Sequence, residues 1–430
     1  MTEEPNRGLS NPMTQIPTVV IIGVNEMALA AARNLHGHGV EVLAIHPGGG
    51  PPSAFSLSRT FATRLGPSLD DEEAFGIFLE GLPDELGGRP VLLPAQDQAL
   101  LFLHAYRARL RQYFDFFVWD SDLLQAIGSK AGLAEVAREH QLPVPRSFAP
   151  RNPDELQQAA DELRYPCIIK PEFTNDWWTE AAHAEDLNRK AIEAVDRATL
   201  MNVCQRSARV GARVVIQEKI VGPDSSHLSY MTFIDRSGDP VGEVIVEKHR
   251  VSPPRFGVAC YAEATLAQDA IDLGREVLSR IGFRGLASVQ FKRDARDGKL
   301  YLIEINLRLP LAVGLPISAG VELPYIYYQV ARGDRPVQGP VRVGARWMAF
   351  GRDIRSMRVY AREGTYSWVA WLIELLRMPA FTVFSVRDPL PTLAMAWDVA
   401  RSALLRRWRA LRGARLDNPK VRRSHEANKA

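Results

Sequence analysis

A strand–helix–strand pattern near the N-terminus constrains the fold of this chain more than any other feature. The β-branched residues 18–22 lead into Gly23 and a helix-forming stretch at 26–36, and Gly39 separates that stretch from a second apolar run at 40–45. This order predicts the opening βαβ unit of a parallel sheet. The turn keeps only the first glycine of the dinucleotide fingerprint, so it is compatible with nucleotide binding or with a purely structural Rossmann-like turn.

The pattern of apolar and polar residues changes several times along the 430 residues, which predicts several compact units. The first is an α/β domain, strands dominate the second half of the central region, and the C-terminal part is mainly helical. The expected boundaries are a disordered leader at 1–15, a Rossmann-like domain at 16–120, a central α+β domain at 121–335 with a small subdomain at about 131–215, a helical extension at 336–412 and a basic tail at 413–430.

Composition excludes several classes of protein. The formal net charge of +3 is small for this length and argues against a nucleic-acid partner. The 3 cysteines show neither a pairing nor a metal-binding spacing, which is typical of a reducing cytoplasm. No apolar run reaches the roughly 18 residues needed to cross a bilayer. The N-terminal residues lack the basic and apolar regions of a signal peptide, so we expect a cytoplasmic protein.

Polar residues follow a predicted strand at 91–93. The strand ends in Pro94-Ala-Gln-Asp97 and leads into a helix, which is where open α/β sheets bind ligands. Asp97 is equally well explained as a helix cap.

Two strands of alternating polarity near the end of the central domain are joined by an Asp-Gly turn, which predicts a hairpin. Glu304 and Asn306 are two residues apart on one strand and therefore face the same side, and pairing brings Gln290 beside them. Converging oxygen ligands of this kind predict a site for a hard cation such as Mg²⁺ or Mn²⁺. Arg308 adds a planar donor for carboxylate or phosphate oxygens. The alternative is an exposed hairpin with ordinary polar alternation.

Two further strand ends carry candidate nucleotide contacts. Lys170 ends an apolar strand, where a fixed cation suits triphosphate oxygens, although lysines at strand ends commonly just extend to solvent. The residues Glu218, Lys219 and Ile220 end another strand, and free backbone groups there could pair with the edge of an adenine. An ordinary strand exit explains the second pattern equally well.

These pieces occur in the order found in the ATP-grasp superfamily, which the chain resembles from about residue 19 to residue 334. The resembling pieces are Leu93–Asp97, Lys130, Leu142–Pro145, Ile168–Pro171, Val215–Ile220 and Leu302–Arg308. The resemblance implies an α/β fold in which a Rossmann-like preATP-grasp domain precedes the two α+β subdomains of an ATP-grasp fold. It also implies that the chain grips ATP and transfers the γ-phosphate to a carboxylate.

The resemblance assigns roles to individual residues. Those implied to bind ATP are Lys130, Lys170, Lys190, Glu218, Lys219, Ile220 and Asp224. In this set the first three lysines would contact phosphates, the hinge after the strand would read adenine, and the aspartate would reach the ribose. The implied metal ligands are Gln290, Glu304 and Asn306, and Arg308 takes the place of the cationic group near the acyl phosphate.

The sequence departs from the family pattern at two places. Many members have a carboxylate where this chain has Gln290, although carbamoyl phosphate synthetases carry glutamine there in a similar context. The flap of the small subdomain is usually glycine-rich, but residues 172–179 contain no glycine. Glycines there let backbone amides approach phosphates. Trp177 and Trp178 in this flap are expected either to cover the site or to pack on a neighbouring element.

The C-terminal region resembles predicted carboxylate–amine ligases related to D-aspartate ligase, through Arg346-Trp347, Asp353-Ile354 and Phe384–Pro391. The same group is resembled by a basic segment of the large subdomain. Arginines suit a substrate carboxylate, which makes candidate substrate-binding residues of Arg250, Arg255 and Gly257. The alternative is a solvated basic loop.

Residues 391–411 combine apolar residues at helical spacing with several arginines. A basic amphipathic helix with tryptophans can lie on an anionic membrane, which would make the protein membrane-associated. A helix packed on the body, with a solvated basic tail, is the alternative.

Together these features predict an ATP-dependent carboxylate–amine ligase. It would use ATP and Mg²⁺ (or Mn²⁺) to convert a small-molecule carboxylate to an acyl phosphate and join it to an amine. One alternative is an enzyme of the carbamoyl- or carboxyl-phosphate type, which Gln290 suggests. Another is a module that binds ATP without turnover, which the unusual flap suggests.

Overall fold

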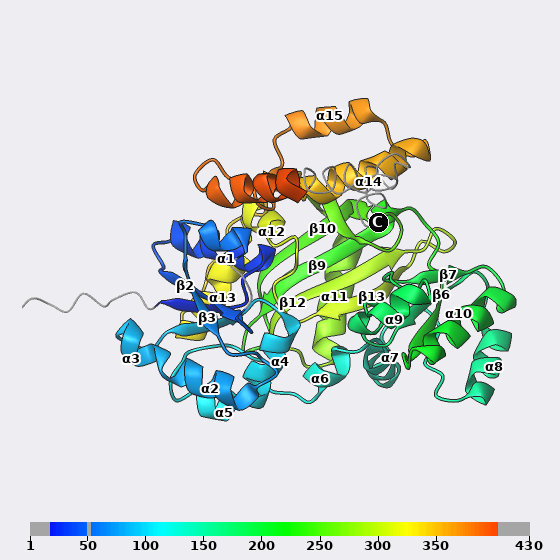
Figure 1. Ribbon diagram of the computed structural model, residues 1–430, viewed down its shortest axis with the longest axis horizontal. Helices are drawn as coiled ribbons and strands as arrows, with labels where there is room; N and C mark the ends of the chain where they lie inside the picture. The colour runs from blue at the N-terminus through cyan, green and yellow to red at the C-terminus, as the bar shows by residue number, and fades with distance from the viewer. Residues whose placement is uncertain (1–17, 50–52, 403–430) are drawn as a thin grey trace, which may run out of the picture.

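The computed structural model describes residues 18–49 and 53–402. Three sheets organise the described part of the chain: a parallel N-terminal sheet, a small antiparallel sheet and a large mixed sheet. Figure 1 shows the N-terminal domain at one end, the small sheet at the other and the large sheet between them.

The N-terminal domain is a parallel sheet of order β3-β2-β1-β4 with helices beside it. Its elements are β1 (Val19–Ile22), α1 (Glu26–Gly37), β2 (Val42–Pro47), η1 (Ala54–Leu57), β3 (Ala62–Gly66), α2 (Glu72–Glu80), α3 (Leu82–Leu86), β4 (Val91–Pro94), α4 (Asp97–Ala105) and α5 (Arg107–Leu110). The side chain of Asn25 caps α1 by accepting from the N–H groups of Met27 and Ala28. The predicted βαβ opening is confirmed.

The small subdomain has an antiparallel sheet of order β5-β8-β6-β7. Its elements are α6 (Leu123–Ile127), α7 (Lys130–Glu139), β5 (Ser147–Phe148), α8 (Pro153–Glu162), β6 (Cys167–Pro171), η2 (Thr174–Trp177), α9 (Glu180–Ala184), β7 (Ile192–Ala194), α10 (Arg197–Arg209) and β8 (Val214–Glu218). Helices α6 and α7 are separate, because the hydroxyl of Ser129 caps the start of α7. The break places Lys130 in the first turn of α7.

The large subdomain is built on a seven-stranded sheet of order β13-β12-β9-β10-β11-β14-β15. Its elements are η3 (Asp224–Ser226), β9 (His227–Ile234), β10 (Pro240–Ser252), β11 (Val258–Thr265), α11 (Gln268–Arg280), β12 (Gly285–Arg293), β13 (Leu300–Asn306), α12 (Gly314–Ser318) and α13 (Leu323–Arg332). The hairpin of β12 and β13 that the sequence predicts is therefore present.

The C-terminal extension adds the last two strands of this sheet and then turns helical. Its elements are β14 (Arg346–Met348), α14 (Phe350–Arg362), α15 (Trp368–Leu376) and β15 (Ala380–Phe381), and residues 390–402 are helical. The sequence did not predict α14. Its arginines look solvated in the sequence, but it buries Asp353, Ser356, Met357 and Tyr360 against the sheet.

The extension also holds the N-terminal domain. Buried Asp388 accepts hydrogen bonds from Arg33 of α1, from the Ser58 hydroxyl and from the Arg59 amide. Arg352 of α14 forms an ion pair with Glu26 at the start of α1, at 2.6 Å. The extension therefore contacts the N-terminal domain as well as the large sheet (Figure 1).

The second half of the predicted membrane helix, from residue 403, lies outside the described residues. In the described half, Leu393 and Trp397 are exposed to solvent. None of the helices described is long and apolar enough to span a membrane.

Candidate functional site

Four lysines surround one carboxylate between the small and the large sheets. Glu304 lies on β13 with 40% of its side chain exposed, and its Oε2 is 3.8 Å from Nζ of Lys190. Lys130, Lys170 and Lys248 also act electrostatically on this carboxylate. Burial would raise the pKa of Glu304, but the surrounding lysines lower it overall, so the group stays ionised.

Each lysine comes from a different element. Lys130 opens α7, Lys170 lies on β6, Lys190 precedes β7 and Lys248 lies on β10. The small sheet and the large sheet thus both contribute. Four cations around one carboxylate leave an excess of positive charge, which favours a polyanionic ligand such as a triphosphate.

Burial lowers the pKa of Lys130, Lys170 and Lys248. It is the largest reason that the pKa of Lys170 falls to about 8, and Lys190 and Lys130 add to the effect. Burial likewise lowers the pKa of Lys248 to about 8 and lowers the pKa of Lys130. A bound anion would restore their charge, because a nearby opposite charge favours the protonated form.

Lys248 is a site residue that the sequence analysis did not select. Its Nζ donates to Oε1 of Gln290 at 2.5 Å, so the glutamine on β12 orients a lysine on β10. No simple alternation marks Lys248, because a β-bulge between Lys248 and Arg250 on β10 turns the two side chains to opposite sides of the sheet. Arg250 was predicted to bind substrate instead, because a planar guanidinium pairs well with a carboxylate.

The last residues of β8 direct their side chains to opposite faces of the small sheet. Gln217, not Glu218, shares the lysine side of the small sheet, and its Oε1 accepts from Nζ of Lys170 at 2.9 Å. Glu218 accepts from the Arg164 amide at 3.4 Å on the opposite face. Alternation along β8 explains the difference, because neighbouring residues of a strand face opposite sides.

The next two hinge residues are occupied within the protein. Lys219 donates to both carboxylate oxygens of Glu193 at 2.8 Å, and Ile220 is buried. Both side chains are therefore engaged within the protein, and the Lys219 carbonyl also accepts from Nη2 of Arg296 at 3.2 Å. Asp224 follows at the start of η3, within electrostatic range of Lys248 and Lys292.

The hairpin brings the predicted metal ligands into register. Gln290 pairs with Glu304, and Ser288 pairs with Asn306. Among the described residues no group of three His, Cys, Asp or Glu side chains could hold a metal. One carboxylate with neighbouring amide oxygens fits Mg²⁺, which takes few protein ligands and draws the rest from phosphates and water. Gln290 is the weakest member of this set, because its oxygen already accepts from Lys248.

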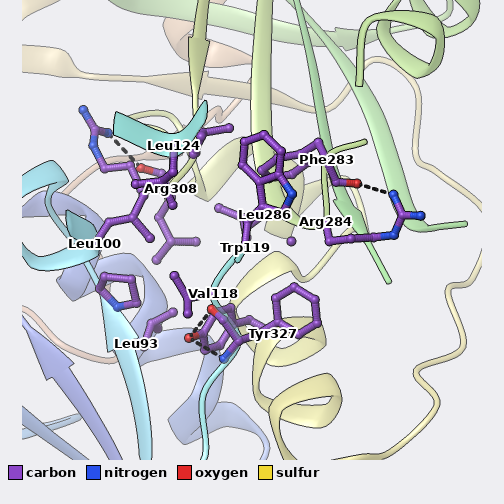
Figure 2. A pocket seen from close by; sticks show the side chains of 15 residues that line it. Leu93, Leu100, Val118, Trp119, Leu124, Phe283, Arg284, Leu286, Arg308 and Tyr327 are labelled. Carbon is purple, nitrogen blue, oxygen red and sulfur yellow. Dashed lines mark hydrogen bonds between the residues drawn. The ribbon is translucent and has the colours of Figure 1, made fainter. Parts of the chain in front are cut away.

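Arg308 joins the hairpin to the N-terminal domain. Its Nε donates to Oδ1 of Asp97 at 2.7 Å, and Nη1 donates to the Leu309 carbonyl at 3.0 Å. Figure 2 shows Arg308 at the edge of an apolar gap lined by Leu93 and Leu286 among others. That cavity is about 20 Å³, room for one water, so it is part of the domain interface and not a substrate pocket.

The structure corrects the substrate-binding interpretation of Arg250. This side chain is only 1% exposed, and it donates to both carboxylate oxygens of Asp353 at 2.9 and 3.0 Å and to Glu374 at 2.6 Å. Its guanidinium also lies between the rings of Tyr261 and Tyr366. All three nitrogens are engaged, so Arg250 attaches the extension to β10 and cannot reach a substrate.

Arg255 and Gly257 lie in the loop between β10 and β11. Arg255 forms an exposed ion pair with Glu363 at 2.9 Å, and its amide donates to Oδ2 of Asp224 at 3.0 Å. A side chain at Gly257 would approach the backbone of Ser252 and Pro253 to about 2 Å, so the glycine is required for packing. The hydrogen bond from Arg255 places the loop beside Asp224. The tight packing explains why residue 257 is a glycine, without a role in substrate binding.

The flap is held in place by an aromatic side chain. Trp177 at the end of η2 is fully buried, and its indole N–H donates to the Ser207 hydroxyl at 3.0 Å. Trp178 is exposed to solvent. Of the two alternatives for these residues, packing on a neighbour holds for Trp177. The glycine-free flap is therefore a 3₁₀ turn anchored in the core of the small subdomain.

Known proteins resemble parts of this chain. Residues 247–349 match the family model described as ATP-grasp in the biosynthetic pathway with Ter operon. A D-aspartate ligase of Enterococcus faecium is 22% identical over 228 residues, 51% of this chain and 53% of that protein. A carbamoyl phosphate synthase large chain of Clavibacter michiganensis is 24% identical over 226 residues, 49% of this chain and 20% of that protein. The chain thus spans about half or less of the length of these relatives.

Solved structures share the fold at low sequence identity. The biotin carboxylase domain of the 2-oxoglutarate carboxylase of Hydrogenobacter thermophilus, solved with MgADP, ADP and bicarbonate, has a TM-score of 0.58, 18% identity and coverage of 77% of this chain and 74% of that one. An L-amino acid ligase from Bacillus licheniformis has a TM-score of 0.54, 16% identity and coverage of 73% and 74%. At these identities the likeness shows the fold.

The structure thus combines a Rossmann-like domain with two α+β subdomains, and lysines from both subdomains surround the Glu304 carboxylate. Residues 247–349 match an ATP-grasp family model, and the chain shares its fold with the solved structures above. Its relatives include ligases and carboxylases, and one of them was solved with MgADP bound.

Proposed function

We propose that this chain is an ATP-dependent carboxylate–amine ligase that releases ADP and phosphate. The observation that carries the proposal is the group of four lysines around Glu304, drawn from both subdomains. Support also comes from the likeness to D-aspartate ligase and to an L-amino acid ligase.

The lysines would bind the triphosphate and hold its γ-phosphorus in line with a carboxylate oxygen of the substrate. That oxygen forms a bond to phosphorus and ADP leaves, which gives an acyl phosphate. Little covalent chemistry falls to the protein in such a step, so position and charge supply most of the acceleration. Glu304 and Asn306 would hold Mg²⁺ (or Mn²⁺), which neutralises phosphate charge when bound.

In the second step the amine nitrogen attacks the acyl carbon and phosphate leaves, so that an amide bond forms. The proposed role of Arg308 is to stabilise the negative charge on the tetrahedral adduct. Its ion pair with Asp97 holds the guanidinium at the edge of the N-terminal sheet, where open α/β sheets bind ligands. The substrates would therefore meet ATP where the N-terminal domain faces the large sheet.

The test is ADP formation by the purified chain with MgATP and a panel of amino acids and envelope precursors, each with and without amines. ADP that requires both an acid and an amine supports the ligase. ADP formed with bicarbonate alone would favour the carbamoyl- or carboxyl-phosphate alternative, which Gln290 and the likeness to carbamoyl phosphate synthase support. Tight MgATP binding with no ADP formation under any condition would leave the non-catalytic module.

Contact with an anionic membrane surface is a second proposal, which concerns where the enzyme acts. Helix α15 presents an apolar face to solvent, formed by Val369, Leu372, Ile373 and Leu376, and the exposed Arg377 follows it. Exposed apolar residues flanked by arginine favour anionic lipid.

Co-sedimentation with anionic and neutral vesicles tests this proposal. We expect salt-sensitive binding to anionic vesicles that Leu372→Glu removes. The matched control is Ile77→Glu, which adds the same charge at an exposed apolar position on α2. Failure of the wild-type chain to bind anionic vesicles at low salt would refute the proposal.

A further inference from the structure

A tyrosine of the C-terminal extension reaches the expected ribose end of the nucleotide site. Tyr360 lies on α14 and is 8% exposed. Its hydroxyl donates to Oδ2 of Asp224 at 2.7 Å and accepts from the Val251 amide at 3.2 Å. Burial is the first reason that the pKa of Tyr360 is raised, and the hydrogen bond to Asp224 is the second. The hydroxyl therefore remains a donor at any physiological pH.

Asp224 is held from two sides by this arrangement. The Arg255 amide donates to the same oxygen, Oδ2, at 3.0 Å. Both side-chain contacts recorded within the described part of the chain fall on Oδ2, so Oδ1 keeps its capacity to accept. Lys248 and Lys292 act electrostatically on this carboxylate, which places it at the margin of the lysine group.

The helix that carries Tyr360 is itself fixed to the large sheet. About two helical turns before the tyrosine, Asp353 forms the fully buried ion pair with Arg250 of β10. Three residues after the tyrosine, Glu363 pairs with Arg255 in the loop beside Asp224. The position of the Tyr360 hydroxyl is thus set by contacts on both sides of it along α14.

We propose that Tyr360 is a positioning residue for the nucleotide: it fixes the Asp224 carboxylate so that Oδ1 accepts hydrogen bonds from the ribose hydroxyls. The inference rests on the proposed function, because it takes ATP as the ligand. It makes the C-terminal extension part of the nucleotide site, although the extension lies more than a hundred residues beyond the hinge that reads adenine. A tyrosine that only stabilised α14 would have no influence on which sugar is bound.

The experiment compares equilibrium binding of MgATP and of the magnesium complex of 2′,3′-dideoxy-ATP to the full chain and to Tyr360→Phe. Hydrogen bonds to a charged group are strong, so losing the aligned acceptor should weaken MgATP binding by about tenfold. The dideoxy nucleotide has no ribose hydroxyl to lose, so its affinity should change by less than about twofold, within the spread expected for a surface change. Equal losses for both nucleotides, or no loss for either, would overturn the inference.

Two further variants test whether the effect is specific to Tyr360 and depends on Asp224. Tyr366→Phe is the matched control, because it also removes a hydroxyl that donates to a carboxylate of the extension, that of Glu374. It should leave the preference for ATP over the dideoxy nucleotide unchanged. Asp224→Asn should remove that preference, and adding Tyr360→Phe to it should have no further effect on the preference if the two residues act together.

The outcomes separate this inference from the proposed function. A wild-type chain that does not bind MgATP would overturn both. A chain that binds MgATP, and in which Asp224→Asn keeps the full preference for ATP, would overturn the inference while leaving the ligase proposal intact. Should Tyr360→Phe fail to fold, the Asp224→Asn comparison alone gives this answer.

Discussion

Replacing Arg250 by methionine distinguishes the role that the sequence suggests from the role that the structure assigns. Arg250 and Asp353 are 1% and 0% exposed, and they share two hydrogen bonds, while Glu374 accepts a third. Methionine keeps much of the side-chain volume but leaves the Asp353 carboxylate buried without its cation. Breaking one partner of a buried pair costs about 3–5 kcal/mol. That cost falls on the docking of α14 and α15, because Asp353 and Glu374 lie on them.

Hydrogen–deuterium exchange measures this cost directly. An opening free energy lower by about 3–5 kcal/mol raises the open population, and with it the exchange rate of the protected amides of α14 and α15, by roughly 10²–10⁴-fold. The matched control is Arg255→Ala, which breaks the exposed pair with Glu363, whose side chains are 66% and 35% exposed. Such pairs contribute about 0–1 kcal/mol, so exchange should rise by less than about fivefold.

A substrate-binding Arg250 would give the opposite pattern. The methionine variant would then need more of the acid substrate, and the exchange of α14 and α15 would change little. Exchange raised by less than about tenfold would refute the magnitude argued from burial.

Three more predictions follow from the lysine group. Glu304→Gln should weaken Mg²⁺ binding and lower turnover by at least about 10²-fold, measured as ADP formation against Mg²⁺ concentration, and near wild-type turnover at limiting Mg²⁺ would remove Glu304 from the metal site. Lys170→Ala and Lys190→Ala should raise the KM for ATP more than the KM for the acid, since both lysines are expected at the triphosphate; a nucleotide-bound structure with either lysine far from phosphate would contradict this. The pKa values of Lys170 and Lys248 fall to about 8, so both lysines are charged below pH 8 and become neutral as the pH rises through it. MgATP affinity should therefore drop by roughly tenfold between about pH 7 and pH 9.5, as for a lost charged hydrogen bond, and a flat profile in calorimetric titration would count against these two residues.

The sequence predicted the sheets well where periodicity was strong. The βαβ opening and the β12–β13 hairpin are local patterns, so each can be read from about a dozen neighbouring residues. Helix α14 was missed because its helical character depends on what it packs against. Its arginines dominate the pattern, and only the fold reveals that Asp353 and Tyr360 are buried beneath them.

For the candidate site residues, too, local patterns were predictable and contacts between distant elements were not. Side chains fixed by one strand, such as Glu304 and Asn306, were placed on one side correctly by alternation. Hydrogen bonds and ion pairs between side chains on different helices and strands were not predicted. Lys248 meets Gln290 across 42 residues, and Arg250 meets Asp353 across 103. An arginine on a strand gives no sign in the sequence of whether a carboxylate elsewhere in the chain will neutralise it.

The strand β14 has a consequence for how this protein can be shortened. It pairs with β11 along residues 261–263, and β15 pairs with β14 in turn. A truncation that ended before residue 346 would leave the backbone N–H and C=O groups of β11 that face β14 without partners, at an open sheet edge. Such an edge invites pairing with another chain, so the shortened protein would be prone to aggregate. The family-matched segment ends at residue 349, just past β14, and the C-terminal limit of a self-standing catalytic body lies beyond that strand.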